Sequence, residues 1–153
     1  FIVACGTAMH AGLMGKSIIE KLCRIPVEVD IASEFRYRNP IIDEKTLCIF
    51  VSQSGETADI YKQIENAYRN RIATILITGN PNSSIAKIST VVLSTLSEEF
   101  SILTDALNSR ISQFCLIDAL FSMISIKDAN RMIPRLQETR NTFKKYKIEQ
   151  NNL

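Results

Sequence analysis

The segment LCIFVSQSGET, residues 47–57, joins a short apolar run to a polar turn. Residues 47–51 are all apolar, which is typical of a strand covered on both faces. The turn that follows holds two serines, a glycine and a threonine, and helical spacing continues to about residue 69. A buried strand, a polar turn and a helix in this order predict one βα unit of a parallel sheet.

The same alternation continues on both sides of this segment. Further strands are expected at residues 1–4, 27–31, 72–77 and 91–93. After the first strand, apolar residues recur with helical spacing at Ala11, Met14, Ile18 and Leu22. Shorter helices are expected at residues 34–37 and 83–88. Five strands alternating with helices predict an α/β three-layer sandwich. Its five-stranded parallel sheet is expected in the flavodoxin-like order 2-1-3-4-5.

Beyond these strands the chain is expected to be helical. Residues 104–126 are apolar on several helix faces, with buried candidates Leu107, Ile111, Phe114, Leu116, Leu120, Phe121 and Ile124. Such a helix is covered by more than its own sheet, which favours a homodimer or higher homo-oligomer through the C-terminal helices. Asp128 is placed to cap a last helix, whose regular part is expected after Pro134 because proline disrupts a helix interior.

Length and charge limit the classes of protein to which the chain can belong. Its 153 residues predict a single domain over 1–153, and 18 Lys+Arg against 16 Asp+Glu leave a net charge of only +2. We therefore expect no binding of nucleic acid or of a membrane surface by this segment. We expect no apolar stretch as long as a membrane span, and the four scattered cysteines predict reduced core thiols of a cytoplasmic protein without a metal site. A start at Phe1, inside an apolar run, suggests a segment of something longer.

Two polar turns are expected to meet at one edge of the sheet. In the order 2-1-3-4-5 ligands bind at the carboxyl ends of strands 1 and 3, which here lead into Cys5-Gly6-Thr7 and into residues 52–55. Hydroxyls and unpaired N–H groups at helix N-termini predict a phosphate site without lysine. The alternative for Ser52, Ser54 and Thr57 is ordinary capping of the next helix. Neither a P-loop nor a GxGxxG motif is present.

Three residues are weaker candidates for proton transfer. His10 is expected in the first helical turn near this edge, where it is either an acid or base acting on a sugar, or a partly buried histidine bonded to backbone. Glu98 and Glu99 follow another strand end. Each is either a carboxylate that moves a proton beside a carbonyl, as aldose–ketose isomerisation requires, or part of a solvated acidic loop.

Residues 3–58 resemble a known family. The stretches ACGTAMHAG (residues 4–12), IPVEVDIASEFRYRNP (25–40) and SQSGETAD (52–59) are similar to the first sugar-isomerase (SIS) domain of the glutamine–fructose-6-phosphate aminotransferases. The resemblance implies that Ser52, Gln53, Ser54 and Thr57 hold the phosphate of a hexose or hexosamine phosphate. It also implies that Thr7 and Ala8 line the sugar, without the side-chain contact of the serine that the family often has at Ala8.

The second half of the chain resembles a different family. Residues 78–148, including TGNPNSSIAK (78–87), SEEF (97–100) and SRISQFCLIDALF (109–121), are similar to the SIS domain of RpiR-type transcriptional regulators. The chain is therefore either an unusual natural member or a hybrid of two SIS sequences. Both resemblances imply the same fold and the same phosphate loop.

Three functions stay open from the sequence. The first is a phosphosugar-binding module or sensor that needs no cofactor and is not catalytic alone. The second is a single-domain aldose–ketose isomerase that uses Glu98, Glu99 and His10. The third is a hybrid or excised scaffold with a vestigial site. The glutaminase, second SIS and DNA-binding domains that the two resemblances imply have no counterpart in these residues, so neither amino-sugar synthesis nor DNA recognition is expected from this segment alone.

Overall fold

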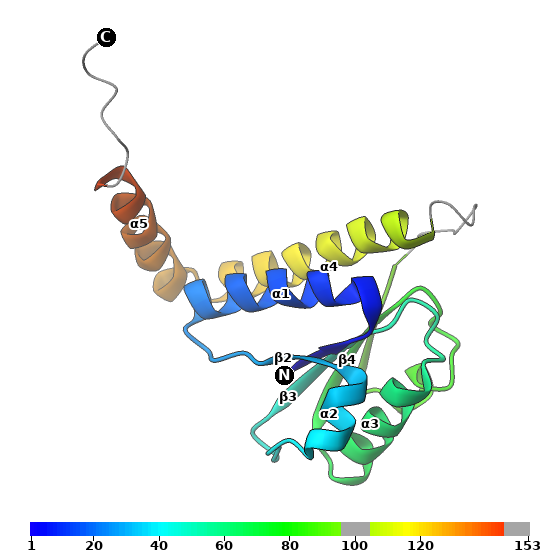
Figure 1. The fold of residues 1–153 in the computed structure, drawn as a ribbon. Coiled ribbons are helices and arrows are strands. Elements are labelled where there is room, and N and C mark those ends of the chain that lie inside the picture. The colour runs from blue at the N-terminus through cyan, green and yellow to red at the C-terminus, as the bar shows by residue number, and fades with distance from the viewer. Residues whose placement is uncertain (96–104, 146–153) are drawn as a thin grey trace.

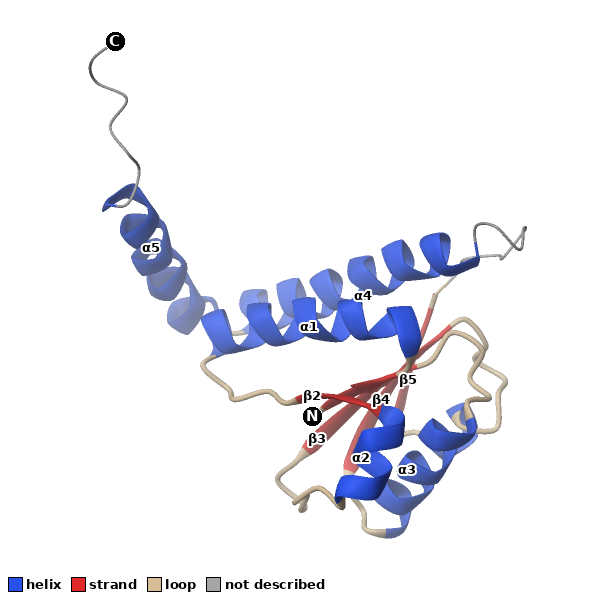
Figure 2. Ribbon diagram, viewed as in Figure 1, coloured by secondary structure: helices blue, strands red, loops and turns tan. Residues whose placement is uncertain are grey.

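A computed structural model describes residues 1–95 and 105–145 of the chain (Figures 1 and 2). The strands are β1 (Ile2–Ala4), β2 (Val29–Ile31), β3 (Leu47–Val51), β4 (Ala73–Thr78) and β5 (Val91–Ser94). The α-helices are α1 (Met9–Ile18), α2 (Ala32–Arg38), α3 (Ala58–Arg69), α4 (Asp105–Lys127) and α5 (Ala129–Lys145). Short 3-10 turns span Gly6–Ala8 and Ala86–Ile88, and a π-helical turn, Ile19–Cys23, extends α1.

The sheet has the predicted topology. All four strand pairs are parallel and the order is β2-β1-β3-β4-β5. Figure 2 shows α1 and α4 on one side of the sheet and α2 and α3 on the other. The three-layer α/β sandwich expected from the alternation of strands and helices is therefore confirmed.

The sheet separates two cores, and its central strands contribute side chains to both. Alternate residues point to opposite faces of a strand, so β3 sends Ile49 and Val51 toward α1 and α4 and sends Phe50 toward α2 and α3. Phe50 packs edge-to-face with Phe35 of α2, with ring centroids 6.5 Å apart. Burial on both faces explains why residues 48–51 are all apolar, whereas Leu47, at the start of the strand, is exposed.

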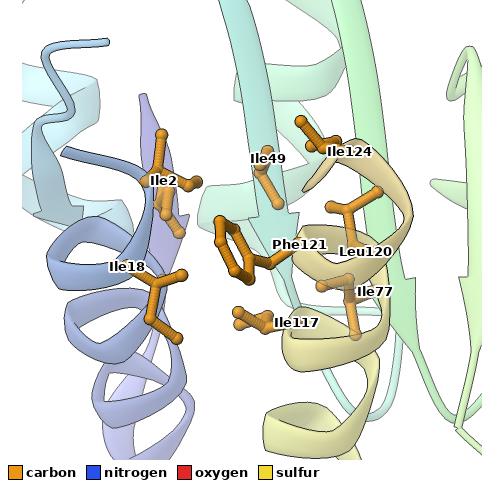
Figure 3. A pocket seen from close by; sticks show the side chains of 10 residues that line it. Ile2, Ile18, Ile49, Ile77, Ile117, Leu120, Phe121 and Ile124 are labelled. Atoms are coloured by element: carbon orange, nitrogen blue, oxygen red, sulfur yellow. The ribbon is translucent and has the colours of Figure 1, made fainter. Parts of the chain in front are cut away.

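Glycine allows α1 to approach its neighbours closely. A Cβ atom added at Gly15 would lie 3.2 Å from Ile2 Cδ1 and 3.4 Å from Ile117 Cγ2 of α4. Beside it lies a crevice with about 20 Å³ of free volume, into whose lining Ile18 and Phe121 project from the two helices (Figure 3). This space is about that of one water molecule and is lined by apolar side chains, so it is a packing defect and not a ligand site.

The last helix begins earlier than the sequence predicts. α5 is regular from Ala129 and runs through Pro134, so the placement of its regular part after the proline is wrong. Tertiary packing offsets the hydrogen bond that the proline cannot donate. Met132 is buried against Leu22, and Arg135 Nη1 donates to the Leu22 carbonyl at 3.0 Å, which anchors the helix on both sides of Pro134.

The long helix is less covered than expected. Ile111 and Ile124 are exposed, so their assignment to the core is wrong, whereas Ile117 is buried on the sheet. Leu107 lies outside the residues whose side chains are described.

Residues 108–127 of α4 are also long and apolar enough to cross a membrane, which corrects the expectation that no such stretch exists. This is weak evidence for a membrane span, because helices of soluble proteins pass the same test. The structure describes one chain, so the helix-mediated oligomer and the cytoplasmic location stay predictions.

All four cysteines are free thiols. Cys23 and Cys48 are buried and Cys5 is half-buried, as expected for core residues. Cys115 is exposed on α4, so its assignment to the core is wrong.

Two glycines of α1 offer a matched stability test. At Gly15 an added methyl meets the tip of the Ile2 side chain beside a crevice, so Gly15→Ala should gain helix propensity and change the free energy of unfolding by less than about 1 kcal/mol. At Gly12 the methyl meets Ile2 Cγ2 and Val29 Cγ1, both at 3.1 Å and both on stiff β-branched side chains. Urea denaturation should show Gly12→Ala less stable than Gly15→Ala by about 1 kcal/mol or more. Equal stabilities would contradict this view of the α1 contact.

Candidate functional site

A polar cavity lies at the carboxyl ends of β1 and β3. Its free volume is about 250 Å³, and its lining consists of Cys5, Thr7, Ala8, Val51, Ser52, Gln53, Ser54, Thr57, Ser109 and Gln113. The chain leaves β1 toward α1 on one face and leaves β3 toward α3 on the other, so the two loops diverge and leave space between them. The six residues expected to form the binding site all line this one cavity.

The loop between β3 and α3 is held by its own serines. Gly55 N donates to Ser52 Oγ at 3.2 Å, and Glu56 N donates to Ser54 Oγ at 3.3 Å. Gly55 has a φ of 66°, in the left-handed region that glycine adopts readily. A Cβ atom at this position would also lie only 2.4 Å from Ser83 Oγ. The turn therefore requires glycine for two independent reasons.

Thr57 does not behave as an ordinary helix cap. It occupies the N-cap position of α3, yet its side chain makes no capping hydrogen bond. Its Oγ1 instead lies 3.2 Å from Ser52 Oγ, so the two hydroxyls are paired at the cavity. The capping alternative therefore fails for Thr57, and the first N–H groups of α3 are not satisfied by this side chain.

Gln53 is held by hydrogen bonds to the ends of two other strands, β4 and β5, and to the helix α4. Its main-chain oxygen accepts the Gly79 N–H at 2.9 Å, just after β4. Its side-chain Oε1 accepts from Thr95 Oγ1 at 3.2 Å and from Gln113 Nε2 at 3.4 Å. Gly79 makes room for this arrangement, because a Cβ there would lie 2.2 Å from Gln53 Nε2. The side chain of Gln53 thus has one well-defined position beside the cavity.

Two lining residues escaped the sequence analysis. Ser109 and Gln113 lie four residues apart on α4, which places them on the same face of that helix. They fall within SRISQ, residues 109–113, a stretch used above only as part of a resemblance. Two polar residues at i and i+4, followed on the same helix face by the apolar Ile117, were the signal that could have identified them.

Within residues 1–95 and 105–145, no charged side chain lines the cavity. Burial is the main cause that raises the pKa of the Cys5 thiol, so this thiol is neutral at pH 7 and adds no charge. Glu56 lies outside the lining and accepts hydrogen bonds from Ser84 N at 3.1 Å and Ser84 Oγ at 2.6 Å. The hydroxyl bond is the largest cause that lowers the pKa of Glu56, and the carboxylate ties the loop to the turn after β4.

The proton-transfer candidates are not assembled at this cavity by the described residues. His10 lies in the first turn of α1 as expected, but it is exposed and does not line the cavity. Glu98 and Glu99 lie outside the described residues. Over residues 1–95 and 105–145 there is no group of three His, Cys, Asp or Glu side chains that could hold a metal ion.

A larger hollow lies elsewhere, between the π-helical turn and α5. It has about 390 Å³ of free volume and is lined by Lys21, Arg24, Arg135, Glu138, Thr139 and Thr142. The guanidinium of Arg135 already bonds the Leu22 carbonyl at the end of the π-helical turn. Arg135 therefore already serves the C-terminal end of a helix, and we place the candidate site at the two strand ends instead.

The chain matches known proteins over different extents. It is 61% identical over 87 residues to glutamine–fructose-6-phosphate aminotransferase of Clostridium tetani (strain Massachusetts / E88), covering 57% of this chain and 14% of the relative. It is 56% identical over 95 residues to the same enzyme of Caldanaerobacter subterraneus subsp. tengcongensis, covering 62% and 16%. The chain thus spans about a seventh of these relatives, and the matches leave more than a third of it uncovered.

Solved structures extend the likeness to nearly the whole chain. The C-terminal domain of glucosamine-fructose-6-phosphate aminotransferase from Francisella tularensis is 30% identical, with a TM-score of 0.69 over 92% of this chain and 41% of that one. The Vibrio vulnificus NanR protein complexed with ManNAc-6P shares the fold at 21% identity, with a TM-score of 0.69 over 92% and 54%. The family model named "SIS domain" matches residues 1–123. This chain therefore belongs to the SIS domain family.

Proposed function

We propose that the chain is a phosphosugar-binding SIS domain, which holds a hexose or hexosamine phosphate as a sensor or substrate-binding module. One observation carries this proposal: the hydroxyls of Ser52, Ser54 and Thr57 surround a cavity at the N-terminus of α3, and Thr57 is not used as a cap. The chemistry of this cavity matches a phosphate attached to a polar small molecule.

The loop supplies the kinds of donor that a phosphate needs. An anion at a helix N-terminus accepts hydrogen bonds from unpaired N–H groups and gains from the positive end of the helix dipole. Ser54 and Thr57 add hydroxyl donors that rotate to suit the ligand. Among the described residues that line the cavity there is no lysine or arginine, so the donors they offer are hydroxyls and backbone dipoles.

The opposite wall suits the sugar. Thr7 and Ala8 follow β1, across the switch point from the phosphate loop, and they offer one hydroxyl and one apolar contact. Two similar proteins support this ligand class. One is an aminotransferase named for fructose 6-phosphate, and the other is NanR, which is complexed with ManNAc-6P. The aminotransferase activity belongs to proteins of which this chain covers about a seventh, so we propose only the binding step.

Ligand binding is tested by calorimetry with sugar phosphates. A ligand at a hundred times its Kd should stabilise the chain by about 2.7 kcal/mol, seen as a raised Tm. The double variant Ser54→Ala/Thr57→Ala should weaken the binding of fructose 6-phosphate and of inorganic phosphate by at least about tenfold, because two donors to an anion are lost. Ser17→Ala/Thr142→Ala removes two exposed hydroxyls outside the cavity and should leave both affinities unchanged.

Three results of that experiment have different meanings. Binding without turnover supports the module or sensor. Ketose–aldose conversion that disappears in Glu98→Gln or Glu99→Gln would instead identify the single-domain isomerase. If no sugar phosphate binds, the chain is a scaffold with a vestigial site and the proposed function is wrong.

The turn at Gly55 is tested by adding one methyl group. Gly55→Ala forces a left-handed alanine against Ser83 Oγ, so we expect a loss of at least about 2 kcal/mol in the free energy of unfolding. Phosphate affinity should fall as well, because displacing this turn moves the hydroxyls of Ser54 and Thr57 that line the cavity. Gly6→Ala is the matched control: Gly6 also has positive φ, at 56°, but a Cβ there meets no atom within 4 Å, so only the conformational cost remains. Equal losses in the two variants would show that the contact with Ser83 is unimportant.

A further inference from the structure

Gln113 combines deep burial with an unsatisfied polar atom. Only 1% of its surface is exposed, although it lines the cavity from α4. Its Nε2 donates to Gln53 Oε1 at 3.4 Å, while its Oε1 is buried and has no hydrogen-bond partner in the part of the chain that the structure describes. The residue that follows it by one helical turn, Ile117, is buried and apolar, so this face of α4 does not otherwise demand a polar side chain.

An orphaned acceptor of this kind is costly. A buried carbonyl oxygen without a donor destabilises a fold by about 1–3 kcal/mol, and native structures keep few of them. A leucine or methionine at this position would remove the cost without losing volume. A glutamine at this position is therefore explained best by a hydrogen-bond donor on a ligand that binds in the cavity.

The surroundings of Gln113 fix which of its atoms awaits a ligand. Gln53 Oε1 accepts from both Thr95 Oγ1 and Gln113 Nε2, so the amide group of Gln113 is oriented with its NH2 toward Gln53. The remaining atom is an acceptor. A phosphate group at pH 7 offers mainly acceptor oxygens, so it is a poor partner for this atom, whereas sugar hydroxyls and amino or amide N–H groups are good ones.

We propose that Gln113 is a specificity-determining ligand-binding residue, whose Oε1 accepts a hydrogen bond from an O–H or N–H group on the sugar part of the ligand. This inference rests on the proposed function and deepens it. The loop of residues 52–57 holds the phosphate. Gln113 bonds the sugar, and the side-chain amide of Gln53 orients Gln113. The two ends of the ligand are therefore recognised by separate parts of the chain.

The proposal is tested with Gln113→Met, which keeps the length of the side chain and removes its acceptor. For the intact chain and the variant, calorimetry would measure the Kd of fructose 6-phosphate, of N-acetylmannosamine 6-phosphate and of inorganic phosphate. We expect the best-bound sugar phosphate to weaken about five- to tenfold, as for one hydrogen bond, and inorganic phosphate to change less than twofold. The Tm should not fall, because the orphaned atom is gone. Gln113→Leu is the second variant if the first misfolds.

Gln63 provides the matched control. It is also a buried glutamine, but it lies on α3, on the opposite face of the sheet. Gln63→Met should leave every Kd unchanged. A deoxy analogue of the sugar phosphate that loses affinity for the intact chain but not for Gln113→Met would identify the ligand group that bonds Oε1.

The outcomes separate this inference from the proposed function. Unchanged affinities in Gln113→Met would overturn the inference while phosphosugar binding that depends on Ser54 and Thr57 stands. Equal weakening of sugar phosphate and inorganic phosphate would also overturn it, because that pattern means a disturbed loop. If the intact chain binds no phosphosugar, the proposed function fails and the inference fails with it.

Discussion

The pairing of β1 with β3 is the constraint on which the rest of this molecule depends. Ile2, Val3 and Ala4 lie beside Ile49, Phe50 and Val51, and the strand order changes direction at this pair. Two parallel neighbours whose connections leave to opposite faces cannot fill the space above their own carboxyl ends. The cavity is thus a product of topology, and the side chains at the two turns decide only what it binds.

Small residues make the topology usable. Gly55 lets its turn pack against Ser83, where a Cβ atom would clash. Gly79 leaves the space that the side chain of Gln53 occupies. Serine and threonine oxygens then satisfy loop N–H groups that would otherwise need water. The loop is therefore rigid before a ligand arrives, which lowers the entropy lost on binding.

Sequence patterns and the family resemblance predicted the sheet and most of the residues that line the cavity, and they failed where distant contacts decide the outcome. The strand Leu47–Val51 and its polar turn were evident because burial of residues 48–51 on both faces leaves a continuous apolar run. The start of α5 was misplaced, because the packing of Met132 on Leu22 overrides the proline rule. Ile111 and Ile124 were assigned to the core from their apolar character, which does not distinguish a buried face of α4 from an exposed one. Gln113 was missed because its partner, Gln53, lies sixty residues away in the chain.

The walls of the cavity come from both halves of the chain. The loop after β3 belongs to the part that resembles aminotransferases, whereas Ser109 and Gln113 belong to the part that resembles regulators. Under the proposed function, substitutions in the second half can alter one wall of the cavity while the phosphate loop of the first half stays unchanged. Under the proposed function, such a fold separates the binding of a phosphate from the selection among sugar phosphates. Related proteins can therefore share one scaffold and bind different ligands.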